Sequence, residues 1–336
     1  MGKEDTTTSL TMEKETTKDG TTTNAMATNA MATNAMATNG TAINAMATDG
    51  NRLTLISRPT ASSRAVVVEQ ALTGKHSQAD CEDGIVVADN YIAVIDGSTS
   101  KTPKHYHPSM RNGRYAMTLI SDYLRRAPAS LSVNEFCTRV TQVIHQAYPL
   151  DDSQPRCSPE QRLCASAVVC NLQHKEIWMI GDCQCMVDGQ LYTNDKPSEA
   201  TIAEERSRLF PTLLAEHPDM VKDGRIVHDY ARDAVLPKLI ASMRGENRTY
   251  AVIDGFEIFM PGVKVITLRQ GEPHDIVLAS DGYPFLRPTL QDSEAALREQ
   301  LANDPYNIHT FKATKGLMQG NVSFDDRALI RFRLTK

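Results

Sequence analysis

The sequence predicts an α+β protein in which largely antiparallel sheets pack against helices. Two blocks of short strand patterns are separated by two helices, and further helices and strands follow. This order lacks the regular alternation of strand and helix that predicts a doubly wound parallel sheet. With 336 residues, of which 41% are hydrophobic and 23% charged, the chain can bury a sizeable core.

Alternating apolar and β-branched residues predict the strands, and apolar residues at helical spacing predict the helices. The predicted strands cover residues 65–70, 84–88, 91–95, 165–172, 177–181, 185–192, 249–253, 262–269, 275–279 and 328–334. The predicted helices cover residues 109–126, 133–148, 199–216, 230–243 and 293–301. A turn at Asp89-Asn90 joins two strands into a hairpin, and residues 165–192 suggest three consecutive antiparallel strands.

The N-terminal segment differs in composition from the rest of the chain. TNAMA recurs at residues 23–27, 28–32 and 33–37, with a decayed copy at 43–47. A period of five fits neither a helical face nor a strand, and so few large apolar groups cannot offset the entropy of ordering the chain. We therefore expect a disordered low-complexity tail over residues 1–52 and a globular domain over 53–336. A docking or regulatory arm is the functional alternative for the tail.

Composition and charge exclude several classes of protein. The net charge of −5, with acids and bases interspersed, gives no basic face for nucleic acid. No apolar run approaches the roughly 20 residues of a transmembrane helix, and the N-terminus lacks the apolar core of a signal peptide. Seven cysteines without a C-x-x-C pair are typical of reduced thiols rather than of disulfides or zinc. We expect a cytoplasmic protein.

Acidic residues recur beside buried strands, where the chain must turn. They occur in Glu82-Asp83, Asp96-Gly97, Gly181-Asp182, Asp281-Gly282 and Asp325-Asp326. A carboxylate among apolar residues costs free energy unless a cation or hydrogen bonds compensate it. One Asp-Gly pair is a common turn, but several such sites with few arginines nearby favour hard cations bound by oxygen.

The order of these motifs resembles the protein phosphatase 2C family of metal-dependent serine/threonine phosphatases. The resemblance covers residues 60–336, and VLASDG at 277–282 is its most specific part. It implies a four-layer α-β-β-α sandwich of two antiparallel sheets flanked by helices. It also implies a centre for two Mg²⁺ or Mn²⁺ ions, with a third as an option, and makes residues 53–336 a phosphatase 2C-like catalytic domain.

The same resemblance assigns expected roles to single positions. The matches to the family's two-metal ligands are Asp83, Asp96, the Gly97 carbonyl, Asp281 and Asp325. Glu82 matches a position that contacts water on the metal, and Asp182 with Asp281 matches a looser third site. Asp326 stands where the family usually has asparagine, so either member of Asp325-Asp326 is a candidate ligand. Two such ions can activate a bridging water for in-line attack on a phosphoryl group.

Two positions depart from the family pattern. Gln78 stands where the family often has an arginine that clamps the substrate phosphate, and Lys75 or His76 could replace it. Ser98 stands where eukaryotic members have a histidine that can act as general acid. His105 and His107 follow on the next loop with Lys101 nearby, although a loop histidine is more often simply exposed. The catalytic candidates are therefore Lys75, His76 and His105.

The sequence thus predicts a phosphatase that hydrolyses phosphoserine or phosphothreonine in a phosphorylated protein substrate. The alternative is a pseudophosphatase, a binding module that keeps the fold without turnover, which Gln78 and Ser98 favour. A structural calcium-binding protein is a third hypothesis, weakened by the absence of an EF-hand loop pattern from the sequence. Residues 191–248 fall where the family has a variable flap, and their charges indicate a solvated helical insertion near the substrate.

Overall fold

A computed structural model of the chain describes residues 43–46, 52–57 and 65–335. The TNAMA repeats at 23–37, and with them most of the tail expected to be disordered, lie outside the described residues. Two described strands nevertheless fall in or overlap that tail, β1 (Ile43–Met46) and β2 (Arg52–Ser57). Each pairs antiparallel with the next strand along the chain, so their backbone groups find partners that side-chain composition does not reveal. The boundary expected at residue 52 stays a prediction.

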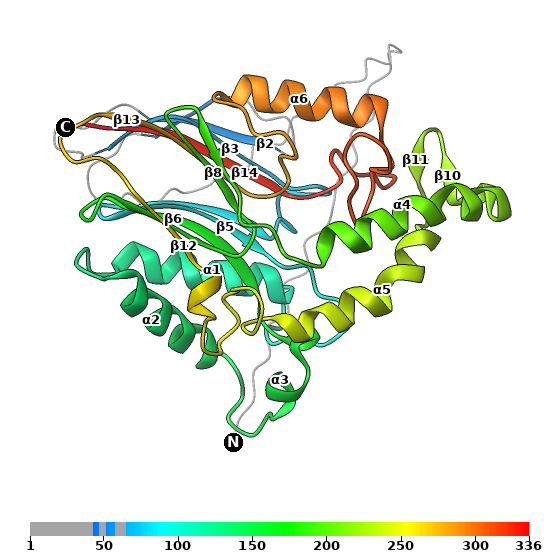
Figure 1. Ribbon diagram of the computed structural model, residues 1–336, viewed down its shortest axis with the longest axis horizontal. Coiled ribbons are helices and arrows are strands. Elements are labelled where there is room, and N and C mark those ends of the chain that lie inside the picture. The colour runs from blue at the N-terminus through cyan, green and yellow to red at the C-terminus, as the bar shows by residue number, and fades with distance from the viewer. Residues whose placement is uncertain (1–42, 47–51, 58–64, 336) are drawn as a thin grey trace, which may run out of the picture. The chain divides into compact units, whose positions relative to one another are not determined.

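Two antiparallel sheets form the centre of the fold (Figure 1). The seven-stranded sheet has the order β1, β2, β3 (Ala65–Thr73), β14 (Arg327–Leu334), β13 (His274–Ala279), β8 (Gln184–Val187) and β9 (Gln190–Tyr192). The five-stranded sheet has the order β12 (Lys264–Thr267), β7 (Glu176–Ile180), β6 (Ala165–Asn171), β5 (Tyr91–Gly97) and β4 (Asp83–Val87). A separate hairpin pairs β10 (Val221–Lys222) with β11 (Arg225–Ile226).

The two sheets face each other across one apolar core. Val94 and Val168 of the five-stranded sheet are fully buried in the same cluster as Ile276 and Phe332 of the seven-stranded sheet. Apolar side chains on the inner faces of both sheets exclude water from this layer, which provides much of the driving force for folding. Strand ends at one side of this core carry the acidic residues noted in the sequence.

Helices cover the outer face of each sheet, which gives four layers (Figure 1). Helices α1 (Asn112–Arg126) and α2 (Val133–His145) pack on the five-stranded sheet, where Phe136 lies 5.3 Å from Trp178 between ring centroids. Helix α6 (Leu290–Asn303) packs on the seven-stranded sheet through Leu290. The predicted α-β-β-α sandwich is thereby confirmed, and Trp178 is a core residue.

Two further helices form the insertion predicted after residue 191. Helices α4 (Glu199–Glu216) and α5 (Tyr230–Ser242) lie side by side at one end of the sandwich (Figure 1). The fully buried Arg206 of α4 donates to Asp229 at 2.6 Å and to the backbone carbonyl of Ala313 at 3.1 Å. This guanidinium fixes both helices to the segment that precedes β14.

Short helical turns complete the described secondary structure. They are α3 (Gln154–Cys157) and the 3-10 turns Pro159–Gln161, Pro218–Met220, Met243–Gly245 and Met260–Gly262. All seven cysteines are free thiols, as expected. Among the described residues, no helix combines the length and apolarity required to cross a membrane.

The expectation of three consecutive antiparallel strands over 165–192 is wrong. Strands β6 and β7 do pair, but β8 leaves their sheet and pairs with β13. Residues 185–192 are also two strands rather than one, because Asp188 and Gly189 have φ of 50° and 85°. Positive φ at both central residues makes the two-residue turn that suits a tight hairpin.

Residues 249–253 do not form the predicted strand, since their described pairing is limited to isolated bridges. Side chains form hydrogen bonds with the backbone of this segment instead. Asn247 Oδ1 accepts from the backbone N–H of Val252 at 3.1 Å, and its amide donates to Asp254 at 2.8 Å. Asp254 also pairs with Arg162 at 2.6 Å. Local side-chain bonds of this kind compete with strand pairing, and strand propensity alone does not show them.

Candidate active site

The acidic residues singled out in the sequence meet at one end of the sandwich. Asp83 opens β4 and Asp96 lies near the end of β5, and the two residues are direct partners in the register of that pair. Asp182 follows β7, Asp281 follows β13, and Asp325 precedes β14. Burial, followed by the charges of Asp281, Asp83 and Asp182, raises the pKa of Asp96 well above its usual value. The carboxylates therefore form one electrostatic cluster.

Glycines following two of these aspartates allow the close approach of neighbouring segments. A Cβ on Gly97 would lie 2.2 Å from the carbonyl oxygen of Gly113, at the start of α1. A Cβ on Gly282 would lie 2.0 Å from the carbonyl oxygen of Asp326. Because backbone atoms cannot yield at these distances, glycine is required where β5 meets α1 and where the β13 turn meets the start of β14.

At the β4–β5 end of the cluster, Asp83 and Asp96 lack cationic partners among the described residues. No lysine, arginine or histidine of the described chain forms an ion pair with Asp83 or Asp96. The buried oxygens Asp83 Oδ2 and Glu82 Oε1 have no hydrogen-bond partner in the described chain. Burial is the main cause of the raised pKa of Asp83, with the charge of Asp326 adding to it. Buried, unpartnered carboxylate oxygens are the kind of donor that a hard cation would satisfy.

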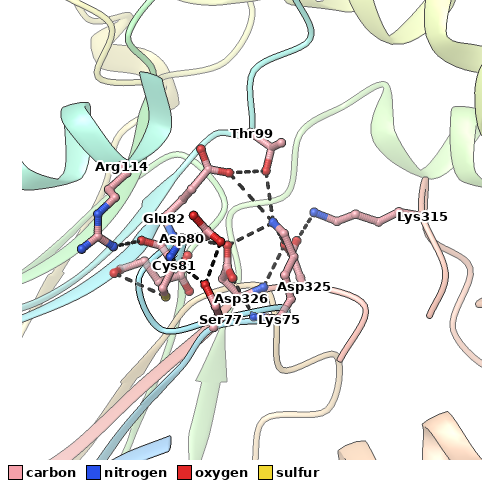
Figure 2. A network of polar contacts seen from close by, with 12 residues as sticks. Lys75, Ser77, Asp80, Cys81, Glu82, Thr99, Arg114, Lys315, Asp325 and Asp326 are labelled. Atoms are coloured by element: carbon pink, nitrogen blue, oxygen red, sulfur yellow. Dashed lines mark hydrogen bonds and ion pairs between the residues drawn. The ribbon is translucent and has the colours of Figure 1, made fainter. Parts of the chain in front are cut away.

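At the β14 end, a lysine compensates the acids (Figure 2). The Lys75 ammonium lies 3.1 Å from Asp325 Oδ1, 3.0 Å from Asp326 Oδ2 and 3.9 Å from Glu82 Oε2. Burial alone would lower the pKa of Lys75, but the charges of these carboxylates outweigh burial and raise it. Thr99 completes the surroundings by accepting from Lys75 at 3.2 Å and donating to Glu82 at 2.6 Å.

Two more lysines engage acids of the same cluster. Lys315 forms an ion pair with Asp325 Oδ2 (Figure 2). Burial opposes ionisation of Asp325, but Lys315 and Lys75 together hold its pKa below the usual value. Lys196 lies 2.5 Å from Asp182 Oδ2. Burial opposes ionisation of Asp182 too, but Lys196 holds its pKa below the usual value. These acids stay ionised at neutral pH.

The fit of this cluster to divalent cations differs between its two ends. Carboxylates and a backbone carbonyl are the donors that Mg²⁺ and Mn²⁺ prefer, and the unpartnered oxygens of Glu82 and Asp83 suit a cation there. Within the described residues, however, no three His, Cys, Asp or Glu side chains are arranged to hold one ion together. At the other end, Lys75 and Lys315 already contact Asp325.

A cavity of about 120 Å³ adjoins the carboxylates. Asp96, Asp182, Asp281 and Asp325 line it, as do residues of the helical insertion. Its cationic lining residues are Lys101, Lys196, Arg232 and Lys315.

Two of these cations remain available to an anion. In the described chain neither Lys101 nor Arg232 forms an ion pair with a carboxylate. Burial, then the charges of Lys315 and Arg232, lowers the pKa of Lys101 to about 8. Arg232 donates to the backbone carbonyl of Thr314, which holds its guanidinium against the cavity wall. An anion in the cavity would relieve the repulsion between these cations.

The remaining predicted site residues have varied positions. Gln78 turns back into its own loop, where it accepts from the backbone N–H of Gly74 at 3.3 Å. Ser98 lines the cavity next to the acids. His105 and His107 line a different cavity with Arg111 and Arg114, which shares no lining residue with the first. His76 follows Lys75 in the loop after β3, and its ring faces Gly320.

Sequence reasoning missed Lys196, Arg232 and Lys315. Lys196 and Arg232 belong to the insertion, where surface charges are common, and Lys315 lies in a loop without a motif. Nothing in the spacing of these residues distinguishes them from solvated lysines and arginines. The docking of α4 and α5 onto the end of the sandwich brings Lys196 and Arg232 beside the carboxylates, and the loop before β14 brings Lys315 there.

No protein-family model and no curated protein matches the sequence. Solved structures with a similar fold include the Mycobacterium tuberculosis serine/threonine phosphatase PstP/Ppp, at 15% identity and a TM-score of 0.41, covering 81% of this chain and 99% of that one. The catalytic domain of PstP in complex with two manganese ions matches at 14% identity and 0.38, covering 80% and 97%. The PP2C phosphatase domain of SpoIIE from Bacillus subtilis matches at 8% and 0.36, covering 87% and 81%.

Proposed function

We propose that the chain is a metal-dependent phosphatase of the protein phosphatase 2C type. In this proposal it uses Mg²⁺ or Mn²⁺ to hydrolyse phosphoserine or phosphothreonine in cytoplasmic proteins. The observation that carries the reaction class is the convergence of buried carboxylates beside a cavity with two unpaired cations. The unpartnered oxygens of Glu82 and Asp83 could bind a cation. Lys101 and Arg232, which line the cavity, could bind an anion. The choice of a protein substrate rests on the resemblance to the protein phosphatase 2C family alone.

The proposed metal-holding residues are Asp83, Asp96, the Gly97 carbonyl and Asp281, with Asp182 and the pair Asp325-Asp326 as further candidates. Glu82 would orient water through its free oxygen. Divalent ions bound there would supply an activated water and would neutralise the phosphoryl oxygens during in-line attack. The number of ions, two with an optional third, remains a proposal from the motif order.

The chain's own side chains would bind and orient the phosphoryl group. Lys101 and Arg232 approach the cavity from the loop after β5 and from α5, so a dianion between them would be held from two sides. This pair would take over the role of the arginine that Gln78 replaces. Ser98 adds a hydroxyl group to the cavity lining that can donate to a phosphoryl oxygen, whereas the hydroxyls of Thr99 and Ser166 already donate to Glu82 and Asp182.

One observation favours the alternative of a weakly active or inactive pseudophosphatase. Asp325 and Asp326 are held by Lys75 and Lys315, which leaves fewer free carboxylate oxygens for ions. In that case the cavity would bind a phosphorylated partner without hydrolysing it. Binding of the same phosphopeptide without turnover would distinguish this alternative from the enzyme.

The test is hydrolysis of p-nitrophenyl phosphate and of a phosphothreonine peptide by the purified chain, with Mn²⁺, Mg²⁺ or EDTA. Turnover that requires the metal and disappears in EDTA is the expected result. Absence of turnover, with Mn²⁺ still raising the melting temperature, would favour the pseudophosphatase. Turnover that is unchanged in EDTA would contradict the metal-dependent mechanism.

A further inference from the structure

Lys75 is built into the carboxylate cluster through its backbone as well as its side chain. Its backbone N–H donates to Asp326 Oδ1 at 2.8 Å, and its carbonyl accepts from the N–H of Val322 at 2.9 Å. These bonds tie the loop after β3 to the segment before β14. The backbone of Lys75 is therefore held in place, which limits the positions that its ammonium group can reach.

The ammonium meets oxygen atoms from three separate segments. Asp325 and Asp326 come from before β14, Thr99 from after β5, and Glu82 from before β4. The exposed fraction of the Lys75 side chain is 18%, against 2% for Glu82 and 4% for Asp326. A partly buried cation surrounded by carboxylate and hydroxyl oxygens from several segments has the surroundings that a bound metal ion has. Here, however, the charge is covalently part of the chain.

Lys75 and the Glu82 backbone together engage both oxygens of Asp326. Its Oδ1 accepts from the Lys75 N–H, and its Oδ2 accepts from the Lys75 ammonium at 3.0 Å and from the N–H of Glu82 at 3.3 Å. Asp83 and Asp96, by contrast, have no such cation in the described chain. Apart from Lys196, which pairs with Asp182, the lysines that pair with acids of the cluster lie at its β14 end.

We propose that Lys75 is a resident cation of the carboxylate cluster, which occupies a position that a divalent ion would otherwise take beside Asp325 and Asp326. The folded chain would then bind divalent ions at the end formed by Asp83, Asp96 and Asp281, and one more ion once the Lys75 charge is removed. This inference rests on the proposed metal centre. It specifies which part of the positive charge comes from Lys75 and which part comes from bound ions. It also means that part of the neutralising charge persists when metal is removed.

The experiment measures the number of Mn²⁺ ions bound per chain, from the electron paramagnetic resonance signal of free Mn²⁺ during titration. The proteins are wild type, Lys75→Met, Lys75→Gln, and the control Lys104→Met. Lys75→Gln removes the positive charge, keeps both aspartates, and retains an amide that can donate to their oxygens, which guards against loss of folding. Lys104 pairs with Asp152 at 2.9 Å and belongs to no part of the cluster.

We expect Lys75→Gln, and Lys75→Met if it folds, to bind one Mn²⁺ more per chain than wild type and Lys104→Met. In EDTA, Lys75→Met should melt several degrees below wild type, and Mn²⁺ should raise its melting temperature more than that of wild type. Equal numbers of bound ions in wild type and Lys75→Gln would overturn the proposal while leaving the metal centre intact. Absence of Mn²⁺ binding to every protein would overturn the metal centre, and this inference with it.

Discussion

Asp83 and Asp96 lie directly opposite each other across the β4–β5 pair, so two acidic side chains share one position in the register. Like charges at directly opposed strand positions destabilise a sheet, and burial of Asp83 adds to that cost. The raised pKa of both carboxyl groups reflects the same conflict, with burial as its largest cause. The Asp83–Asp96 pair therefore makes this part of the sheet less stable, and local destabilisation of this kind is characteristic of functional sites.

Replacing Asp281 by asparagine tests the metal centre most directly. The change is nearly isosteric and removes one negative charge beside Asp96 and Asp325. We expect manganese-dependent hydrolysis to fall by at least about 10- to 100-fold, the range seen when groups that support a metal site are lost. The melting temperature in EDTA should not fall, because the repulsion on neighbouring carboxylates is reduced.

Asp122→Asn is the control for this variant, because Asp122 forms an exposed pair with Arg125 on α1 that contributes little stability. It should leave activity unchanged. Activity of Asp281→Asn that equals that of wild type would remove Asp281 from the metal centre.

Lys101 should make substrate binding dependent on pH. Burial and the neighbouring cations lower its pKa to about 8, so the side chain is charged below that pH and neutral above it. Affinity for a phosphoryl anion should therefore weaken as pH rises through about 8. Lys101→Arg should keep its charge and lose this dependence, whereas Lys101→Met should bind weakly at every pH.

The pH profile of KM, together with inhibition by inorganic phosphate, measures these differences for Lys101. Lys104→Met provides a surface-lysine control. The proposed role would be contradicted by profiles of wild type and Lys101→Met that coincide.

Local patterns in the sequence predict most strands and helices and the α+β class, because strand alternation and helical spacing are local in the chain. The four layers and the roles of the aspartates were expected only from the resemblance to a known family. The lysines that partner these acids, and the cations of the cavity, depend on the packing of distant segments. Lys75 meets Asp326 across a sequence separation of 251 residues, and no spacing rule connects the two. Similarly, the departure of β8 into the other sheet is decided by tertiary packing rather than by strand propensity.

Glu246 should make the stability of the fold depend on pH. Its carboxyl group is buried, with one unpartnered oxygen, and burial followed by the charge of Asp254 raises its pKa to about 8. Arg162, Lys196 and Lys101 oppose this shift without cancelling it. Because the folded pKa lies above the unfolded value, stability is lost as pH rises from about 4.5 towards 8.

Glu246→Gln should therefore become more stable relative to wild type as pH rises, by about 1.4 kcal/mol for each unit of pKa shift. Melting temperatures measured from about pH 5 to about pH 9 would show this, with the exposed Glu257→Gln as control. A constant difference between Glu246→Gln and wild type over this range would disprove the assignment.

Arg206 should hold the helical insertion in place. It is fully buried, pairs with Asp229, and donates to carbonyl groups of the segment before β14. Arg206→Met leaves Asp229 buried without its partner, which should lower the free energy of unfolding by about 3–5 kcal/mol. Urea denaturation measures this loss, and the exposed Arg208→Met on the same helix should change stability by less than about 0.5 kcal/mol.

The loss of Arg206 should also affect binding, because α4 and α5 carry part of the cavity wall. Arg232 lies on α5, and Lys196 just precedes α4, so loosening of the helices would misplace both cations. We therefore expect Arg206→Met to raise KM for the phosphopeptide under conditions in which the sandwich remains folded. The number of bound Mn²⁺ ions should change little, since Asp83 and Asp96 come from the central sheet. If Arg206→Met lost metal binding and peptide binding together, the insertion would support the whole site and not only the cationic side of the cavity.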